Sequence, residues 1–182
     1  MLYHFLTPLS DGGDIFNLFR YITFRSGGAF MTALIFSFVF GRPIINWLRR
    51  MQKKGQPIRE DLPERHIVEK AGTPTMGGAM LLVAIGIATL LWSDLTNRFV
   101  WVVLLTTFAF GAIGWADDYK KIINKDPRGI GAKNKFFWQS VAGLAAAFFL
   151  YYTAASPAET QLIVPVFKDV AINLGPMFIV LT

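Results

Sequence analysis

An uninterrupted apolar run that ends at two adjacent carboxylates constrains this chain more than any other feature. Residues 99–115 read FVWVVLLTTFAFGAIGW without a charged side chain, and Asp117 and Asp118 follow after Ala116. A helix of about 17 residues extends about 25 Å, close to the hydrocarbon thickness of a bilayer. One acid there would more often only meet headgroups. Two acids followed by Lys120 and Lys121 predict a functional site at a membrane surface.

The composition agrees with an integral membrane protein. Of the 182 residues, 53% are hydrophobic and only 16% are charged. The net charge of +6 comes mainly from basic residues in two loops, which indicates membrane topology, and we expect no nucleic-acid partner. The absence of cysteine excludes disulfides and thiolate metal sites. Because no signal-peptide pattern is present, we expect the first span to target the chain to the membrane.

The expected fold class is an all-α polytopic membrane protein with four full transmembrane helices and the start of a fifth. The spans are expected at 26–40, continuing to about 48, and at 76–92, 99–115 and 136–153. The residues before the first span are too interrupted to cross a membrane, and we expect them at the interface. A short β-hairpin is expected in the outer loop near 160–168, because QLIVPVF has strand-like composition.

The fifth apolar segment begins near Pro176 and reaches only Thr182. A membrane helix needs about 20 apolar residues. We therefore expect residues 1–182 to form a single membrane domain that is the N-terminal part of a longer protein.

The basic residues are distributed unevenly between the predicted loops. Of the 18 lysines and arginines, 14 lie in residues 42–70 and 120–135. Cytoplasmic loops carry an excess of Lys and Arg. Both basic loops are therefore expected to be cytoplasmic, with the N-terminus outside.

Two stretches on the predicted cytoplasmic side suit phosphate chemistry. The first, HIVEKAGTPTMGG at 66–78, offers Lys70, a cap from Thr75 and close backbone approach at Gly77 and Gly78, by a neighbouring helix or a ligand. Without Lys70, a helix cap and a small-residue packing face would explain it. The second is the loop at 117–135, whose lysines also suit anionic headgroups. Acids and lysines together are what a diphosphate with Mg²⁺ would need.

The motifs resemble those of the phospho-N-acetylmuramoyl-pentapeptide transferase (translocase I) family, a bacterial branch of the polyprenyl-phosphate sugar-1-phosphate transferases. The likeness rests on HIVEKAGTPTMGG at 66–78 and ADDYKK at 116–121, which one predicted hairpin of spans separates. It extends to FRSGGAFMTAL, to KFFWQS at 135–140 and to TQLIVPVFKD at 160–169. The GTPTMGG run is specific to this branch, whereas the Asp-Asp-Tyr piece is shared more widely.

The resemblance implies an enzyme of the bacterial cytoplasmic membrane, with ten helices and its site on the cytoplasmic face. It would transfer phospho-N-acetylmuramoyl-pentapeptide from its UDP-linked form to undecaprenyl phosphate, giving lipid I and UMP, with Mg²⁺ as cofactor. We also expect contacts with membrane lipid and allow for a homodimer.

The resemblance also assigns site residues. Asp117 and Asp118 match the catalytic acids; we expect Asp117 to assist deprotonation of the lipid phosphate and Asp118 to lie near the metal. The substrate-binding matches are Lys70, Thr75, Lys121, Lys125 and Lys135. The main Mg²⁺ ligand and a His-rich loop of the family are expected beyond Thr182. The chain alone is therefore expected to be inactive.

Two alternatives remain at this point. A sister enzyme would transfer N-acetylglucosamine-1-phosphate to a polyprenyl phosphate, and GTPTMGG argues against it. A membrane transporter would use the acid pair as an ion site among discontinuous helices near the midplane. The acids instead adjoin a basic cytoplasmic loop, which argues against transport.

Overall fold

The computed structural model describes residues 1–9, 15–52, 77–124, 128–163 and 171–181. The chain divides into two compact units, Met1–Gly131 and Ala132–Thr182, and each is treated by itself below.

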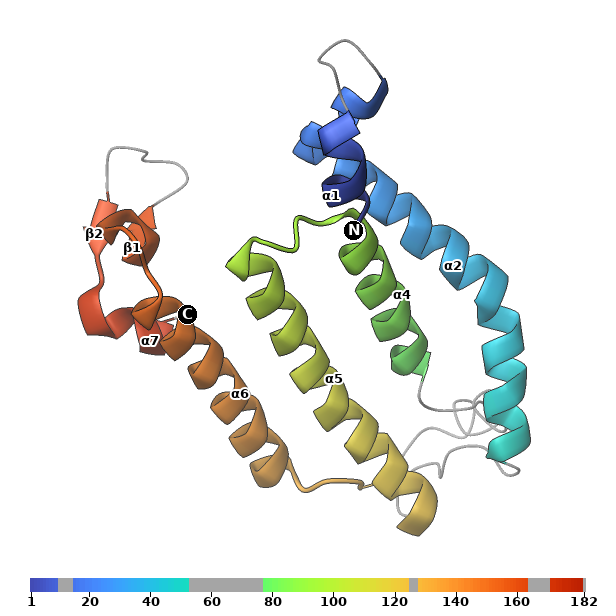
Figure 1. The fold of residues 1–182 in the computed structure, drawn as a ribbon. Coiled ribbons are helices and arrows are strands. Elements are labelled where there is room, and N and C mark those ends of the chain that lie inside the picture. Colours follow the sequence, from blue (N-terminus) through green and yellow to red (C-terminus); the bar gives the residue numbers. More distant parts are fainter. Residues whose placement is uncertain (10–14, 53–76, 125–127, 164–170, 182) are drawn as a thin grey trace. The chain divides into compact units, whose positions relative to one another are not determined.

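The first unit is built on long helices. They are α2 (Ile22–Met51), α4 (Gly77–Trp92) and α5 (Arg98–Asn124), and α4 packs between α2 and α5 (Figure 1). Short helical turns precede them, namely α1 (Leu2–Leu6), η1 (Thr7–Leu9) and η2 (Ile15–Arg20). These turns agree with the expectation that the N-terminal residues do not form a span.

Helix α2 is one continuous helix of 30 residues that contains Pro43. The expectation that the first span continues past this proline is confirmed, although the helix starts at Ile22 rather than near residue 26. Tyr21 precedes it in an extended conformation. Arg49 and Arg50 lie in the last turn, where the negative end of the helix dipole favours cations.

Helix α5 corrects the expected loop at 117–135. It continues past the apolar run through Asp117 and Asp118 and ends at Asn124, so the acids lie on a helix. The physical reason is local, because lysine three and four residues after an aspartate stabilises a helix through ion pairs. In the second unit, α6 (Ala132–Tyr152) begins before the expected residue 136, which shortens the loop from the other side.

The contact between α2 and α4 is made by a tryptophan that fits against a glycine. The indole Nε1–H of Trp92 donates to Oγ1 of Thr32 at 2.9 Å, and the Thr32 hydroxyl donates to the carbonyl of Gly28 at 2.8 Å. A Cβ at position 28 would lie about 2.5 Å from the Trp92 ring. Phe19 stacks on the same ring with a centroid distance of 5.7 Å. The absence of a side chain at Gly28 therefore sets how closely these helices approach.

The second unit contains α6, the turn η3 (Pro157–Thr160), strands β1 (Gln161–Ile163) and β2 (Ala171–Asn173), the turn η4 (Gly175–Met177) and α7 (Phe178–Leu181). The strands are antiparallel, with Leu162 opposite Ile172. The hairpin expected within 160–168 is not confirmed in that range, because the second strand begins only at Ala171.

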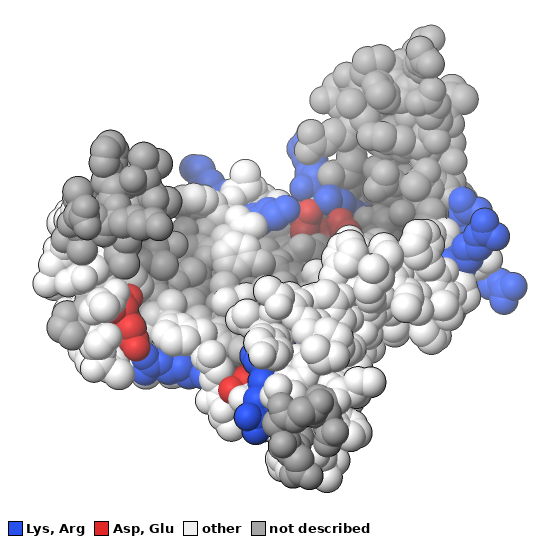
Figure 2. Space-filling view, turned by 90° about the horizontal axis from the view of Figure 1, so that it is seen from above, with Lys and Arg blue, Asp and Glu red and all other residues white. Residues whose placement is uncertain are grey.

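Helix length and surface composition together indicate a membrane protein. In the described part of the chain, α2 and α5 are long and apolar enough to cross a bilayer, and α4 is a shorter apolar helix of 16 residues. The predicted count of four spans is thus not confirmed. Large apolar side chains are exposed, including Phe38 (77%) and Val103 (67%), and most of the described surface in Figure 2 is uncharged. A lipid environment would cover such a surface.

Candidate functional site

The C-terminal end of α5 brings the two predicted acids and one lysine together. Lys121 Nζ lies 2.7 Å from Oδ2 of Asp117, one turn earlier on the helix, and 3.3 Å from Oδ1 of Asp118. Residues three and four apart lie on the same side of a helix. One ammonium group is therefore shared by two carboxylates, which partly neutralises a charge pair that would otherwise repel itself.

A backbone donor from the turn after α5 completes the environment of Asp117. The N–H of Ile130 donates to Oδ1 of Asp117 at 2.8 Å. Gly129, just before it, has a φ of +63°, a left-handed conformation that side chains disfavour. A Cβ there would also collide with Oδ1 of Asp117 and would lie 2.8 Å from Cε of Lys121. The turn can reach the acid only because residue 129 is a glycine.

The two acids differ in burial and therefore in what they can do. Asp117 is only 6% exposed, and its two oxygens accept from different donors. The side chain of Asp118 is 27% exposed. Asp117 is thus held in place by two donors, whereas Asp118 is more accessible to a ligand from solvent.

The acids end an apolar segment whose boundary is marked by aromatic rings. Trp115 and Tyr119 stack along α5 with a centroid distance of 5.1 Å, and each is about half exposed. Tryptophan and tyrosine are enriched where a membrane meets water. This position is consistent with a site at headgroup depth.

Metal donors are limited in the described residues. Among them there is no group of three or more His, Cys, Asp and Glu side chains that could hold an ion. Mg²⁺ commonly uses one or two protein carboxylates, with substrate phosphates and waters. Asp118 fits that role better than Asp117, because both Asp117 oxygens already accept from protein donors.

Of the remaining predicted site residues, the structure describes Lys135 alone. Lys135 lies in the first turn of α6, which belongs to the second unit. Lys70, Thr75 and Lys125 lie outside the described residues. Gly77 and Gly78 begin α4 at the edge of the described part of the chain. A Cβ on either residue would meet no described atom within 4 Å, so among the described residues no neighbouring helix packs against them.

Sequence reasoning missed the turn that holds Asp117. The order Pro-Arg-Gly-Ile-Gly at 127–131 is a strong turn signal, and it could have predicted a reversal after α5. It could not have predicted that the N–H of Ile130 points to a carboxylate 13 residues earlier.

Comparison with known proteins gives a consistent result. The chain is 51% identical over 185 residues to a phospho-N-acetylmuramoyl-pentapeptide-transferase of Maricaulis maris (strain MCS10), which covers 99% of this chain and 50% of that protein. Proteins of the same name from Granulibacter bethesdensis and Ruegeria pomeroyi are 53% and 54% identical, over 98% of this chain and 49% of each relative. No family model matches the chain.

The chain spans about half the length of the curated relatives that it matches. The similarity nevertheless covers nearly every residue of the chain, including both motifs quoted above. Over nearly all of its length, the chain therefore belongs to the phospho-N-acetylmuramoyl-pentapeptide transferase family, as the resemblance of its motifs indicated.

Proposed function

We propose that this chain supplies part of the active site of a Mg²⁺-dependent transferase that makes lipid I. The donor is UDP-N-acetylmuramoyl-pentapeptide and the acceptor is undecaprenyl phosphate. An oxygen of the lipid phosphate attacks the phosphorus next to the sugar, the bond to the second phosphate breaks, and UMP leaves. The observation that supports this reaction most is the identity of about half of all residues with transferases of that name.

The cluster on α5 suits this reaction through its shared lysine. The Lys121 ammonium contacts both acids, and a diphosphate would compete for it because lysine pairs strongly with phosphate oxygens. When Lys121 turns to the substrate, Asp117 loses a stabilising partner and becomes more basic. We assign Asp117 to deprotonation of the lipid phosphate on this ground.

Asp118 is the described residue that we assign to the metal side of the site. Its side chain is more exposed than that of Asp117. Mg²⁺, when bound, would neutralise charge on the diphosphate. Further ligands, and the substrate contacts assigned to Lys70, Thr75, Lys125 and Lys135, are part of the same proposal.

We further propose that the site faces the cytoplasm of a bacterium, with the N-terminus outside. The topology is tested by single cysteines at two exposed positions near the two ends of α5, Lys120 and Phe99. The natural chain has no cysteine, so each reports alone. An impermeant maleimide added to intact cells should label position 99 and not position 120; the reverse pattern would refute the orientation.

The activity is tested by adding back the part of the relatives that this chain does not cover. The purified chain should not form lipid I alone and should do so when coexpressed with the complementary half of the Ruegeria pomeroyi relative. Robust Mg²⁺-dependent transfer by the 182-residue chain alone would contradict the expectation that the main Mg²⁺ ligand lies beyond Thr182. Supplying UDP-N-acetylglucosamine instead separates the sister reaction, which should not proceed.

A further inference from the structure

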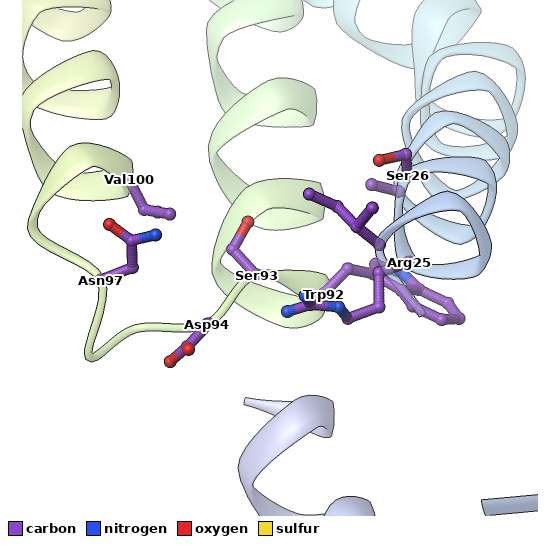
Figure 3. A pocket seen from close by; sticks show the side chains of 9 residues that line it. Arg25, Ser26, Trp92, Ser93, Asp94, Asn97 and Val100 are labelled. Carbon is purple, nitrogen blue, oxygen red and sulfur yellow. The ribbon is translucent and has the colours of Figure 1, made fainter. Parts of the chain in front are cut away.

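An open cavity with charged, polar and apolar side chains in its wall lies at the end of the first unit that is remote from the acid pair. Its volume is about 210 Å³, and it is lined by the first turns of α2, the end of α4, the 93–97 turn and the start of α5 (Figure 3). Val100 lines it, whereas Asp117 is 17 residues further along α5, or about 25 Å. The cavity is therefore separate from the proposed transferase site. Its polar lining consists of Arg25, Ser26, Ser93, Asp94 and Asn97, beside Trp92.

Arg25 is the group that points most directly to a ligand. Its Nε is buried and has no hydrogen-bond partner in the described part of the chain. Its guanidinium carbon lies 4.5 Å from the centroid of the Tyr3 ring, which holds the side chain, and Figure 3 shows it extending from α2 towards the 93–97 turn. A buried donor without an acceptor is unfavourable, and a bound anion would supply the acceptor.

The surroundings of Arg25 reinforce the preference for an anion. Helix α2 begins three residues earlier, at Ile22, and Tyr21 gives it no side-chain cap. The uncapped N-terminus of a helix carries a partial positive charge. The hydroxyls of Ser26 and Ser93 offer further hydrogen bonds at the cavity wall.

The same cavity also contains a fixed negative charge. Oδ1 of Asp94 accepts from the N–H and the hydroxyl of Thr96, at 3.0 and 2.6 Å. The hydroxyl bond contributes most to a pKa of Asp94 below its ordinary value, with smaller help from His4 and Arg25. Asp94 therefore stays ionised at neutral pH. Arg25 and Asp94 thus place opposite charges at one cavity, which suits a ligand that carries both an anionic and a cationic group.

Size and surroundings decide between a soluble and a lipid ligand. Pockets for whole small molecules usually measure about 300–1,000 Å³, so this cavity suits only a small group, which its charged and polar side chains would bind. Apolar side chains in the cavity lining or next to it in the sequence are exposed, including Ile22 (70%), Tyr21 (59%) and Trp101 (41%). These side chains would lie against acyl chains while the polar group occupies the cavity.

We propose that this cavity binds the headgroup of a zwitterionic, ethanolamine-type phospholipid, with the phosphate at Arg25 and the ammonium at Asp94. The acyl chains lie outside, along the exposed apolar faces. This proposal does not depend on the transferase reaction. The cavity lies near the start of α5, whereas Asp117 and Asp118 lie near its end.

The test measures lipid retained by the purified chain in detergent, by native mass spectrometry. The probes are phosphatidylethanolamine, phosphatidylglycerol, diacylglycerol and soluble phosphoethanolamine. Phosphatidylethanolamine should bind best, and Arg25→Gln should weaken it by about tenfold or more, as expected for losing a charged hydrogen bond. Asp94→Asn should remove the preference over phosphatidylglycerol.

Two further variants control for folding and for unspecific charge. Arg98→Gln removes an arginine outside the cavity, whose guanidinium lies 4.9 Å from the Phe99 ring centroid, and should bind as the natural chain does. Ser26→Leu fills the cavity without changing charge and should also abolish binding, which keeps the test valid if Arg25→Gln misfolds. The proposal would be overturned if diacylglycerol or soluble phosphoethanolamine bound as well as phosphatidylethanolamine. Unchanged binding of phosphatidylethanolamine in both Arg25→Gln and Ser26→Leu would also overturn it.

Discussion

Near each end of α5 an aspartate lies close to a cation, but the two sites are built in different ways. Asp117 is bound by Lys121 one turn along the same helix and by the N–H of Ile130 from the next turn. Asp94 is bound by Thr96 in its own turn, and the cations near it include Arg25, from another helix, and the Met1 ammonium. Contacts close in sequence make the first site, and contacts across about 70–90 residues make the second.

The N-terminal residues extend this contrast. The Met1 ammonium donates to the carbonyl of Leu90 at 2.8 Å, and the N–H of Leu95 donates to Nε2 of His4 at 3.1 Å. Nε2 of His4 also lies 3.3 Å from Oδ1 of Asp94. This end therefore depends on docking of residues 1–9, whereas the Asp117 end depends on one helix and one turn.

The largest expected effect is on the reaction. In the complemented protein, Asp117→Asn and Asp118→Asn should each lower lipid I formation by about 100-fold or more, because Asn keeps the shape but loses charge and basicity. The measurement is radiolabelled transfer from the UDP-linked donor. Lys120→Gln, an exposed neighbour on the same helix, is the matched control and should stay near the natural rate. Normal turnover of a folded Asp variant would remove that residue from the mechanism.

The second-largest expected effect tests the turn at Gly129, apart from the charges of the acids. Gly129→Ala should destabilise the first unit by about 2–4 kcal/mol, since a left-handed residue acquires a side chain that collides with Asp117. Gly131→Ala is the control, because its Cβ would meet nothing within 4 Å. Thermal unfolding in detergent gives the difference. Equal midpoints for the two variants would mean that the turn does not hold Asp117.

The contrast between the two ends also explains what the sequence could predict. The apolar run, the position of Asp117 and Asp118 at its end and the continuity of α2 through Pro43 follow from local composition, and these were predicted. The prediction of a loop from residue 117 was wrong, because the helix continues to Asn124. The spacing of Asp117 and Asp118 from Lys121 stabilises this last part of the helix. The Ile130 contact and the cavity at Arg25 and Trp92 depend on tertiary packing, which no local pattern contains.

A smaller effect is expected at the packing of α2 on α4. Gly28→Ala should lower stability by about 1–3 kcal/mol, because its Cβ would press on the Trp92 ring and disturb the bond to Thr32. Gly27→Ala, one residue away, has open space around its Cβ and should change stability little. Thermal unfolding in detergent compares the pair. A smaller loss for Gly28→Ala than for Gly27→Ala would contradict this packing.

The smallest expected effect is a dependence on pH at the Asp94 end. The folded-state pKa of Asp94 is lowered from 3.8, chiefly by the Thr96 hydroxyl. A lowered pKa contributes stability that is present above the unfolded value and is lost as the pH falls through the folded one. The natural chain should therefore lose part of its stability below about pH 4. Thr96→Val removes the main cause and should show less of this acid-dependent loss when unfolding midpoints are compared between pH 6 and pH 3. Because the change concerns one partly exposed carboxylate, its size should stay below that of Gly28→Ala, and an identical pH profile in both chains would show that the hydroxyl bond does not set the ionisation of Asp94.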